Sequence, residues 1–105
     1  MNQKPKTKSF RDYLLKNLSD PVQAAEYINA ALRENDTDFL LTALRDVAEA
    51  KGGMSRLSRT AKLNRPNLYA MLSREGNPRI HTLEGVLHVF GLRLAVMPEL
   101  SKKVA

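Results

Sequence analysis

The chain has 105 residues, and its 17 Lys and Arg against 11 Asp and Glu give a formal net charge of +6. This length fits one domain with its own core, and a hydrophobic content of 43% is that of a globular rather than a disordered protein. The chain has no cysteine, which excludes a disulfide scaffold and thiolate metal sites and suits a reducing cytoplasm. No apolar run reaches the ~20 residues of a membrane span, and no secretory signal follows the basic N-terminus.

The first 19 residues are expected to form a tail and a short helix. Residues 1–9, MNQKPKTKS, are polar and basic and predict a mobile tail, which could follow a phosphate backbone or simply keep the protein soluble. Residues 10–18 carry apolar side chains at helical spacing and predict a short amphipathic helix.

Two longer helices are expected next. Asp20 followed by Pro21 is a strong helix start, and the first helix ends near Asn35. Asp36 or Thr37 caps the second, which ends at the glycines after residue 51. The apolar face of the first helix could pack in the core or dock a partner protein; it comprises Val22, Ala25, Tyr27, Ile28, Ala31 and Leu32. The second helix is expected to brace the two short helices that follow it, and its apolar residues are Phe39, Leu40, Ala43, Leu44, Val47 and Ala48.

Residues 54–80 then predict two short helices joined by a tight turn. Ser55 is a candidate N-cap for the first, over residues 55–61, and Asn64 for the second, from residue 65 to about 74. Pro66 falls in the first turn of the second helix, where its missing N–H costs little. This layout is typical of a helix-turn-helix DNA reader, although two packed helices of a small bundle would show the same pattern.

Charge favours the DNA reader. Residues 52–79 hold six Lys and Arg against one acid, whereas residues 21–51 have a net charge of −3. A cluster of one sign on a helical hairpin is what binding to a phosphate backbone requires.

The C-terminal part predicts one more helix and a strand. The helix opens at His81 or Thr82, has a core stripe of Leu83, Val86, Leu87 and Phe90, and closes at Gly91. Residues 92–97 read as a short β-strand, which must pair with another chain because the sequence offers no second strand. Residues 99–105 are expected to be a tail, which leaves residues 20–98 as the folded domain.

Catalytic and metal sites are not expected. His81 and His88 are seven residues apart and lack the spacing and partner carboxylate of a zinc motif, so they should be ordinary surface or half-buried side chains. No carboxylate pair, Ser/His/Asp set or cysteine nucleophile has a workable spacing, so neither an enzyme nor a cofactor is expected.

The stretches AAEYINAALREND, FLLTALRDVAEAKGGMSRLSRTAKLNRPNLYAMLSREGNP and LEGVLHVFGLRLAVMP resemble the addiction-module antidote proteins, small helix-turn-helix antitoxins of the HigA type. The resemblance covers residues 20–98. It implies an all-α, five-helix, lambda-repressor-like (XRE family) fold with the C-terminal strand. It also implies a dimer that neutralises a small RelE/HigB-like toxin and represses its own operator DNA. The acidic residues 21–51 could attract a small basic toxin.

The resemblance carries residue roles with it. The DNA-facing positions are Arg65, Pro66 and Asn67, then Tyr69 and Ala70, with Ser55 and Arg56 touching phosphate. Their positive charge makes Arg74 and Arg79 further candidates for phosphate contacts. The family commonly has Gln, Ala and Gly where this chain has Arg56, Ser58 and Lys62, and Lys62 lacks the freedom of glycine at positive φ. A phage-like repressor without a toxin would share this DNA chemistry.

Overall fold

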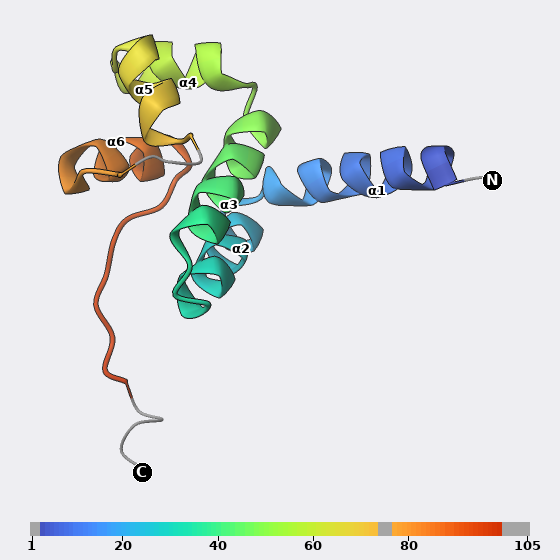
Figure 1. Ribbon diagram of the computed structural model, residues 1–105, viewed down its shortest axis with the longest axis horizontal. Coiled ribbons are helices and arrows are strands. Elements are labelled where there is room, and N and C mark those ends of the chain that lie inside the picture. Colours follow the sequence, from blue (N-terminus) through green and yellow to red (C-terminus); the bar gives the residue numbers. More distant parts are fainter. Residues whose placement is uncertain (1–2, 74–76, 100–105) are drawn as a thin grey trace.

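The computed structural model describes residues 3–73 and 77–99. Within these residues the fold is all-α, as predicted (Figure 1). It has six helices, one before residue 20 and five after it, where the resemblance implied five, and it has no strand. The helices are α1 (Gln3–Leu18), α2 (Pro21–Arg33), α3 (Thr37–Ala50), α4 (Met54–Ala61), α5 (Arg65–Met71) and α6 (Ile80–Val89). None of the helices in this part of the chain is both long and apolar enough to cross a membrane.

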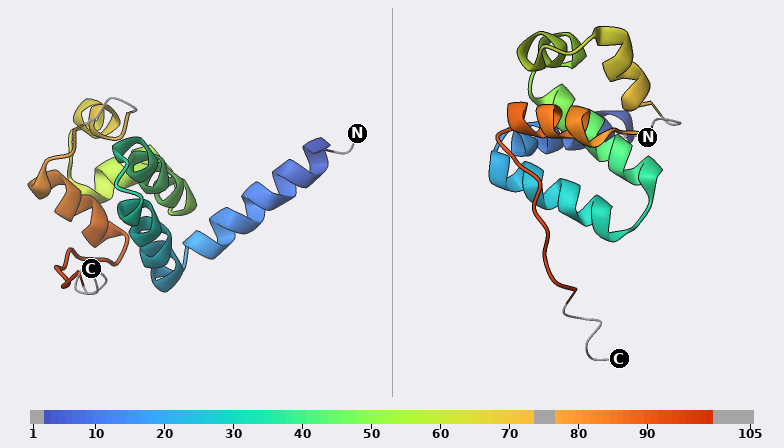
Figure 2. Two further views of the ribbon diagram at one scale, coloured as in Figure 1. Left: turned by 60° about the horizontal axis from the view of Figure 1, so that its bottom comes forward. Right: turned by 90° about the vertical axis from the view of Figure 1, so that its left-hand side faces the viewer.

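Helix α3 links the two halves of the molecule. It packs against α1 and α2 on one side and contacts α4 on the other, and α4 in turn packs against α5 and α6. In Figure 1, the α4–α5 pair therefore lies at one end of α3, and the loop between α2 and α3 lies at the opposite end. The view turned by 90° in Figure 2 shows the same separation.

The caps follow the predicted chemistry at three helix starts. The side chain of Asp20 accepts a hydrogen bond from the backbone N–H of Val22, and Asp36 accepts from Asp38 and Phe39. Asn64 accepts from the backbone N–H of Asn67 at 3.1 Å. Each contact satisfies an amide that the helix leaves without a partner in its first turn.

The N-terminal prediction is wrong over residues 3–9. These residues continue α1 instead of forming a tail, so the short helix expected over residues 10–18 becomes one of 16 residues. Pro5 is compatible with this extension because it lies in the first turn of α1, where the helix loses no backbone hydrogen bond. Figure 1 shows α1 projecting away from the helical body.

The predicted strand over residues 92–97 is absent from the described part of the chain, where residues 92–99 form no helix or strand. The physical reason is the one that the sequence implies, because this single chain offers no second strand for a ladder. Leu92 still packs against the core, but Val96 is 97% exposed. The segment leads away from α6 in Figure 1 and in the right-hand view of Figure 2.

The core is aliphatic with one aromatic ring. Its largest fully buried side chains come from α1, α3, α5 and α6 and the residues just after them: Leu18, Leu41, Leu44, Val47, Leu68, Leu72, Val86 and Phe90. Three residues assigned to apolar core faces are exposed instead, namely Val22, Leu32 and Phe39. Helical register explains Val22, which shares a face of α2 with the exposed Glu26 and Asn29. Phe39 lies one turn before the buried Ala43 and is exposed in the first turn of α3.

Candidate nucleic-acid interface

The turn between α4 and α5 is closed by a residue in the left-handed conformation. Lys62 has φ +57° and ψ +41°, and its N–H bonds back to the carbonyl of Arg59. The next residue, Leu63, is bound twice to Ser58: its N–H donates to the Ser58 carbonyl at 3.0 Å, and its carbonyl accepts from the Ser58 hydroxyl at 2.7 Å. The Ser58 hydroxyl thus reinforces the turn.

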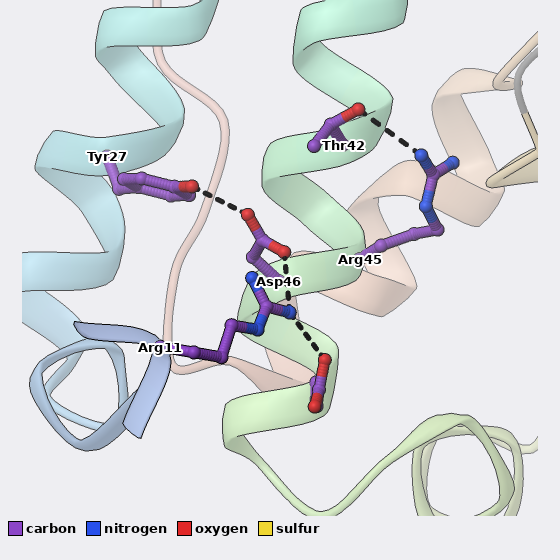
Figure 3. Close-up of polar contacts among 6 residues, drawn as sticks. Arg11, Tyr27, Thr42, Arg45 and Asp46 are labelled. Atoms are coloured by element: carbon purple, nitrogen blue, oxygen red, sulfur yellow. Dashed lines mark hydrogen bonds and ion pairs between the residues drawn. The ribbon is translucent and has the colours of Figure 1, made fainter. Parts of the chain in front are cut away.

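Both ends of α5 are fixed. Asn64 caps its start, and Pro66 occupies the first turn as predicted. The helix ends at Met71, earlier than the predicted residue 74, because Leu72 and Ser73 turn out of the helix and bond back to Leu68 and Ala70. The guanidinium of Arg45, from α3, donates to the Leu72 carbonyl at this end. It also donates to the Thr42 hydroxyl (Figure 3). A cation at a helix C-terminus is also attracted to the negative end of the helix dipole, which stabilises the helix.

Helix α5 buries one side and presents the other to solvent. Leu68 and Met71 face the core, whereas Arg65, Pro66, Asn67, Tyr69 and Ala70 are all exposed. The guanidinium carbon of Arg65 lies 5.7 Å from the centre of the Tyr69 ring, one turn further along. A cation over an aromatic face at this distance is attracted to it, so Tyr69 restrains Arg65 at the start of the helix.

Helix α4 differs in one detail from the prediction. Its N-cap is Gly53, with φ +95°, and not Ser55, whose side chain forms no capping bond. Ser55 is therefore an exposed residue of the first turn. Arg56 is exposed as well, and its side chain folds over Gly52: a Cβ atom placed on Gly52 would lie 2.6 Å from Arg56 Cδ.

The cations of this region remain available to a ligand. Arg56, Arg65 and Arg79 are exposed and form no ion pair with any other described residue. The same holds for Arg59 and Lys62, which counted toward the basic cluster but were left out of the predicted DNA contacts. Arg79 is the N-cap of α6, and Arg74 lies outside the described residues.

A polar cluster joins α1, α2 and α3 (Figure 3). Arg11 reaches Asp46 at 3.0 Å and Glu49 at 2.5 Å, and the Tyr27 hydroxyl donates to Asp46 at 2.6 Å. Burial and this hydrogen bond to a carboxylate raise the pKa of Tyr27 to about 12. The contacts with the carboxylates likewise raise the pKa of Arg11, so both groups hold their protons firmly and the cluster acts as a structural clamp on α3.

Two supporting residues had no signal in the sequence. Arg45 acts on a carbonyl 27 residues away, and Ser58 acts within a turn whose geometry the sequence left open. Neither spacing nor composition identifies such contacts, because the first depends on where the tertiary fold places Arg45 relative to Leu72 and the second on the local geometry of the α4–α5 turn. His81 and His88 are both exposed, as expected of ordinary surface histidines.

Comparison with known proteins places the chain in a family. The chain is 32% identical over 91 residues to an uncharacterized protein of Haemophilus influenzae. The matched region covers 86% of this chain and 93% of the relative. No solved structure matches the chain. The profile of the family described as "Probable addiction module antidote protein" matches residues 7–98, which contain α2 to α6 and most of α1. The chain belongs to this family of addiction-module antidote proteins.

Proposed function

We propose that this protein is the antitoxin of a type II toxin–antitoxin module, acting in the cytoplasm without enzymatic activity. In this proposal it neutralises a RelE/HigB-like toxin and represses its own operator through α4 and α5, as a helix-turn-helix of the HigA type. Family membership supports the antitoxin role. The observation that supports DNA binding is the exposed, cationic α4–α5 pair with its firmly closed turn.

Helix α5 serves as the recognition helix in this proposal. Its exposed leading residues have side chains suited to base edges: Arg65 to O6 and N7 of guanine, and Asn67 to N6 and N7 of adenine. Ser55, Arg56 and Arg79, with the Tyr69 hydroxyl, hold phosphates and fix the register. Arg59 and Lys62 join them because they are exposed cations of the same two-helix unit.

Operator binding is proposed to use a homodimer. In the described part of the chain no strand pairs with the backbone of residues 92–97, and Leu94, Val96 and Met97 within this segment are exposed. Pairing of this segment with its copy across a two-fold axis satisfies the backbone and covers these side chains. Two recognition helices would then contact half-sites about one DNA turn, roughly 34 Å, apart.

A growth experiment tests the antitoxin role. The reading frame beside this gene is expressed alone and then together with this protein. We expect the neighbour to stop growth and the co-expressed protein to restore it. A harmless neighbour would contradict the antitoxin role and leave the alternative of a phage-like helix-turn-helix repressor without a toxin, which needs only the α4–α5 surface.

A binding experiment tests the DNA role. Arg65→Ala should weaken operator binding by roughly 1–3 kcal/mol and relax the preference at one base pair, because a base-reading arginine supplies that much discrimination. Arg33→Ala is a matched control, since Arg33 is an exposed arginine at the end of α2. Equal losses on operator and random DNA would show that Arg65 contacts only phosphate. No salt-dependent DNA affinity in the wild-type protein would leave a pure protein-interaction bundle.

A further inference from the structure

The face shared by α2 and α3 carries an apolar hollow that lies outside the proposed DNA surface and is lined in part by core residues. Its volume is about 100 Å³. It is lined by Tyr27, Ala30, Ala31, Phe39, Thr42 and Ala43. The ring of Phe39 is 51% exposed, and Ala30 is exposed on the α2 side. A large apolar side chain left half in water beside a hollow is what an anchor of a protein interface provides.

Carboxylates flank this hollow along both helices. Glu26 and Glu34 lie one turn before and one turn after Ala30, and Asp38 lies one turn before Thr42. All three are exposed and form no ion pair with a described residue. Of the cations in the same stretch, Arg45 and Lys51 donate to the backbone carbonyls of Leu72 and Ser19, which leaves Arg33 as the one exposed guanidinium near this face.

The sign of the charge decides what could bind here. A ring of carboxylates repels phosphate, so nucleic acid and anionic lipid surfaces are unsuited to this face. A basic protein segment with an apolar side chain fits both features, because the side chain fills the hollow and its cations meet the carboxylates. The face is also distant from α4 and α5, which lie at the other end of α3 (Figure 1).

We infer that the α2–α3 face, with Phe39 and Ala30 at its centre and Glu26, Glu34 and Asp38 around it, binds a basic segment of the toxin. This inference rests on the proposed antitoxin function. The acidic character of residues 21–51 in an otherwise basic chain then has a purpose, since it gives one molecule a negative end for a protein and a positive end for DNA.

A pair of variants on neighbouring positions of α2 tests the inference. Ala30→Arg places a bulky cation in the hollow, and Asn29→Arg places the same side chain on the adjacent position, about 100° around the helix. Both residues are exposed, so both variants should fold, which circular dichroism and operator binding would verify. Titration calorimetry of the full-length variants with the purified toxin should show at least about a tenfold rise in Kd for Ala30→Arg. Asn29→Arg should bind within about twofold of the wild type, since control substitutions outside a binding face cost little.

The charge contribution is tested separately. Neutralising Glu34 and Asp38 together, as Glu34→Gln with Asp38→Asn, should weaken toxin binding and reduce its dependence on salt, whereas Asp12→Asn on α1 should do neither.

The possible outcomes distinguish failure of this inference from failure of the proposed antitoxin function on which it rests. If the wild-type protein does not bind the toxin, the antitoxin function itself fails. If the wild type binds and Ala30→Arg binds equally well, the toxin docks elsewhere and this inference is overturned. If Ala30→Arg leaves toxin binding intact and instead abolishes self-association in light scattering, the face is occupied by a second copy of the chain, which also overturns it.

Discussion

At the scale of single residues, Lys62 occupies a turn position whose backbone conformation favours glycine. The turn needs a residue at positive φ, and Lys62 supplies it at φ +57°, where a Cβ atom is unfavourable. Ser58 offsets part of this cost through its hydroxyl bond to the Leu63 carbonyl. The strain that the sequence suggested at Lys62 is therefore present, and the geometry of the turn is kept.

Replacing Lys62 by glycine should stabilise the protein. Glycine adopts the left-handed region freely, and relief of the strain should exceed the added entropy of the unfolded chain, for a net gain of about 0.5–1 kcal/mol. Urea unfolding measures this free energy. Lys62→Ala is the control, because it removes the same charge but keeps the Cβ atom. If both variants have the same stability, the left-handed residue costs nothing here.

Tyr27 makes the folded state sensitive to alkaline pH. Its pKa is raised to about 12 in the folded protein, against about 10 in an unfolded chain. Below pH of about 10 the hydroxyl is protonated in both states, so its contribution to stability is fully present. As pH rises from about 10 to about 12, the unfolded chain releases this proton while the folded protein retains it, so the free energy of unfolding falls.

Removing the hydroxyl should remove this part of the alkaline decline. We expect Tyr27→Phe to be less stable than the wild type at neutral pH, because the carboxylate of Asp46 loses a donor, and we expect the difference to shrink at alkaline pH. Tyr13→Phe is the control, since Tyr13 is 67% exposed on α1. Chemical unfolding at a series of pH values gives the comparison. A constant difference between wild type and Tyr27→Phe would show that folding does not change the pKa of this phenol.

At the scale of elements, the helix caps could be predicted from neighbouring residues, whereas features that depend on packing between helices could not. Asp20, Asp36 and Asn64 cap helices as predicted because a cap depends on its immediate neighbours. Ser55 is not a cap, because Gly52 and Gly53 continue the turn and start α4 one residue earlier. The extent of α1 and the exposure of Phe39 depend on which helices pack beside them, and this information is not local.

The predicted DNA residues show the same division. The eight that the structure describes are exposed, which helical periodicity alone could indicate. What periodicity could not supply is the stacking of Arg65 on Tyr69 or the hold of Arg45 on the end of α5. The DNA contacts themselves stay a prediction.

The C-terminal segment makes a prediction at this scale. If residues 92–97 pair between chains, Val96→Pro should favour the monomer, because proline removes a backbone donor from the ladder. The monomer should keep its fold, since Val96 is 97% exposed and contributes nothing to the core. Val96→Ala is the control and should stay dimeric. Analytical ultracentrifugation distinguishes the two states, and a dimeric Val96→Pro variant would place the dimer interface elsewhere.

At the scale of the whole molecule, charge and shape divide the protein into two ends. The cations of α4 and α5 lie at one end of α3, and the carboxylates around Phe39 lie toward the other (Figure 1). The clamp of Arg11 on Asp46 and Glu49 joins α1 to the C-terminal part of α3. A molecule built in this way can hold two partners of opposite charge without competition between them.

Toxin and operator should therefore bind at the same time. In a mobility-shift assay, adding toxin to the antitoxin–operator complex should give a slower band and not free DNA. The charge of the partners predicts a further effect: a basic toxin covering the acidic end reduces the repulsion between that end and DNA, so operator affinity should hold or rise as toxin is added. The Ala30→Arg variant should still bind the operator but give no slower band. Release of DNA on addition of toxin would mean that the two partners share a surface, and would place toxin binding at α4 and α5.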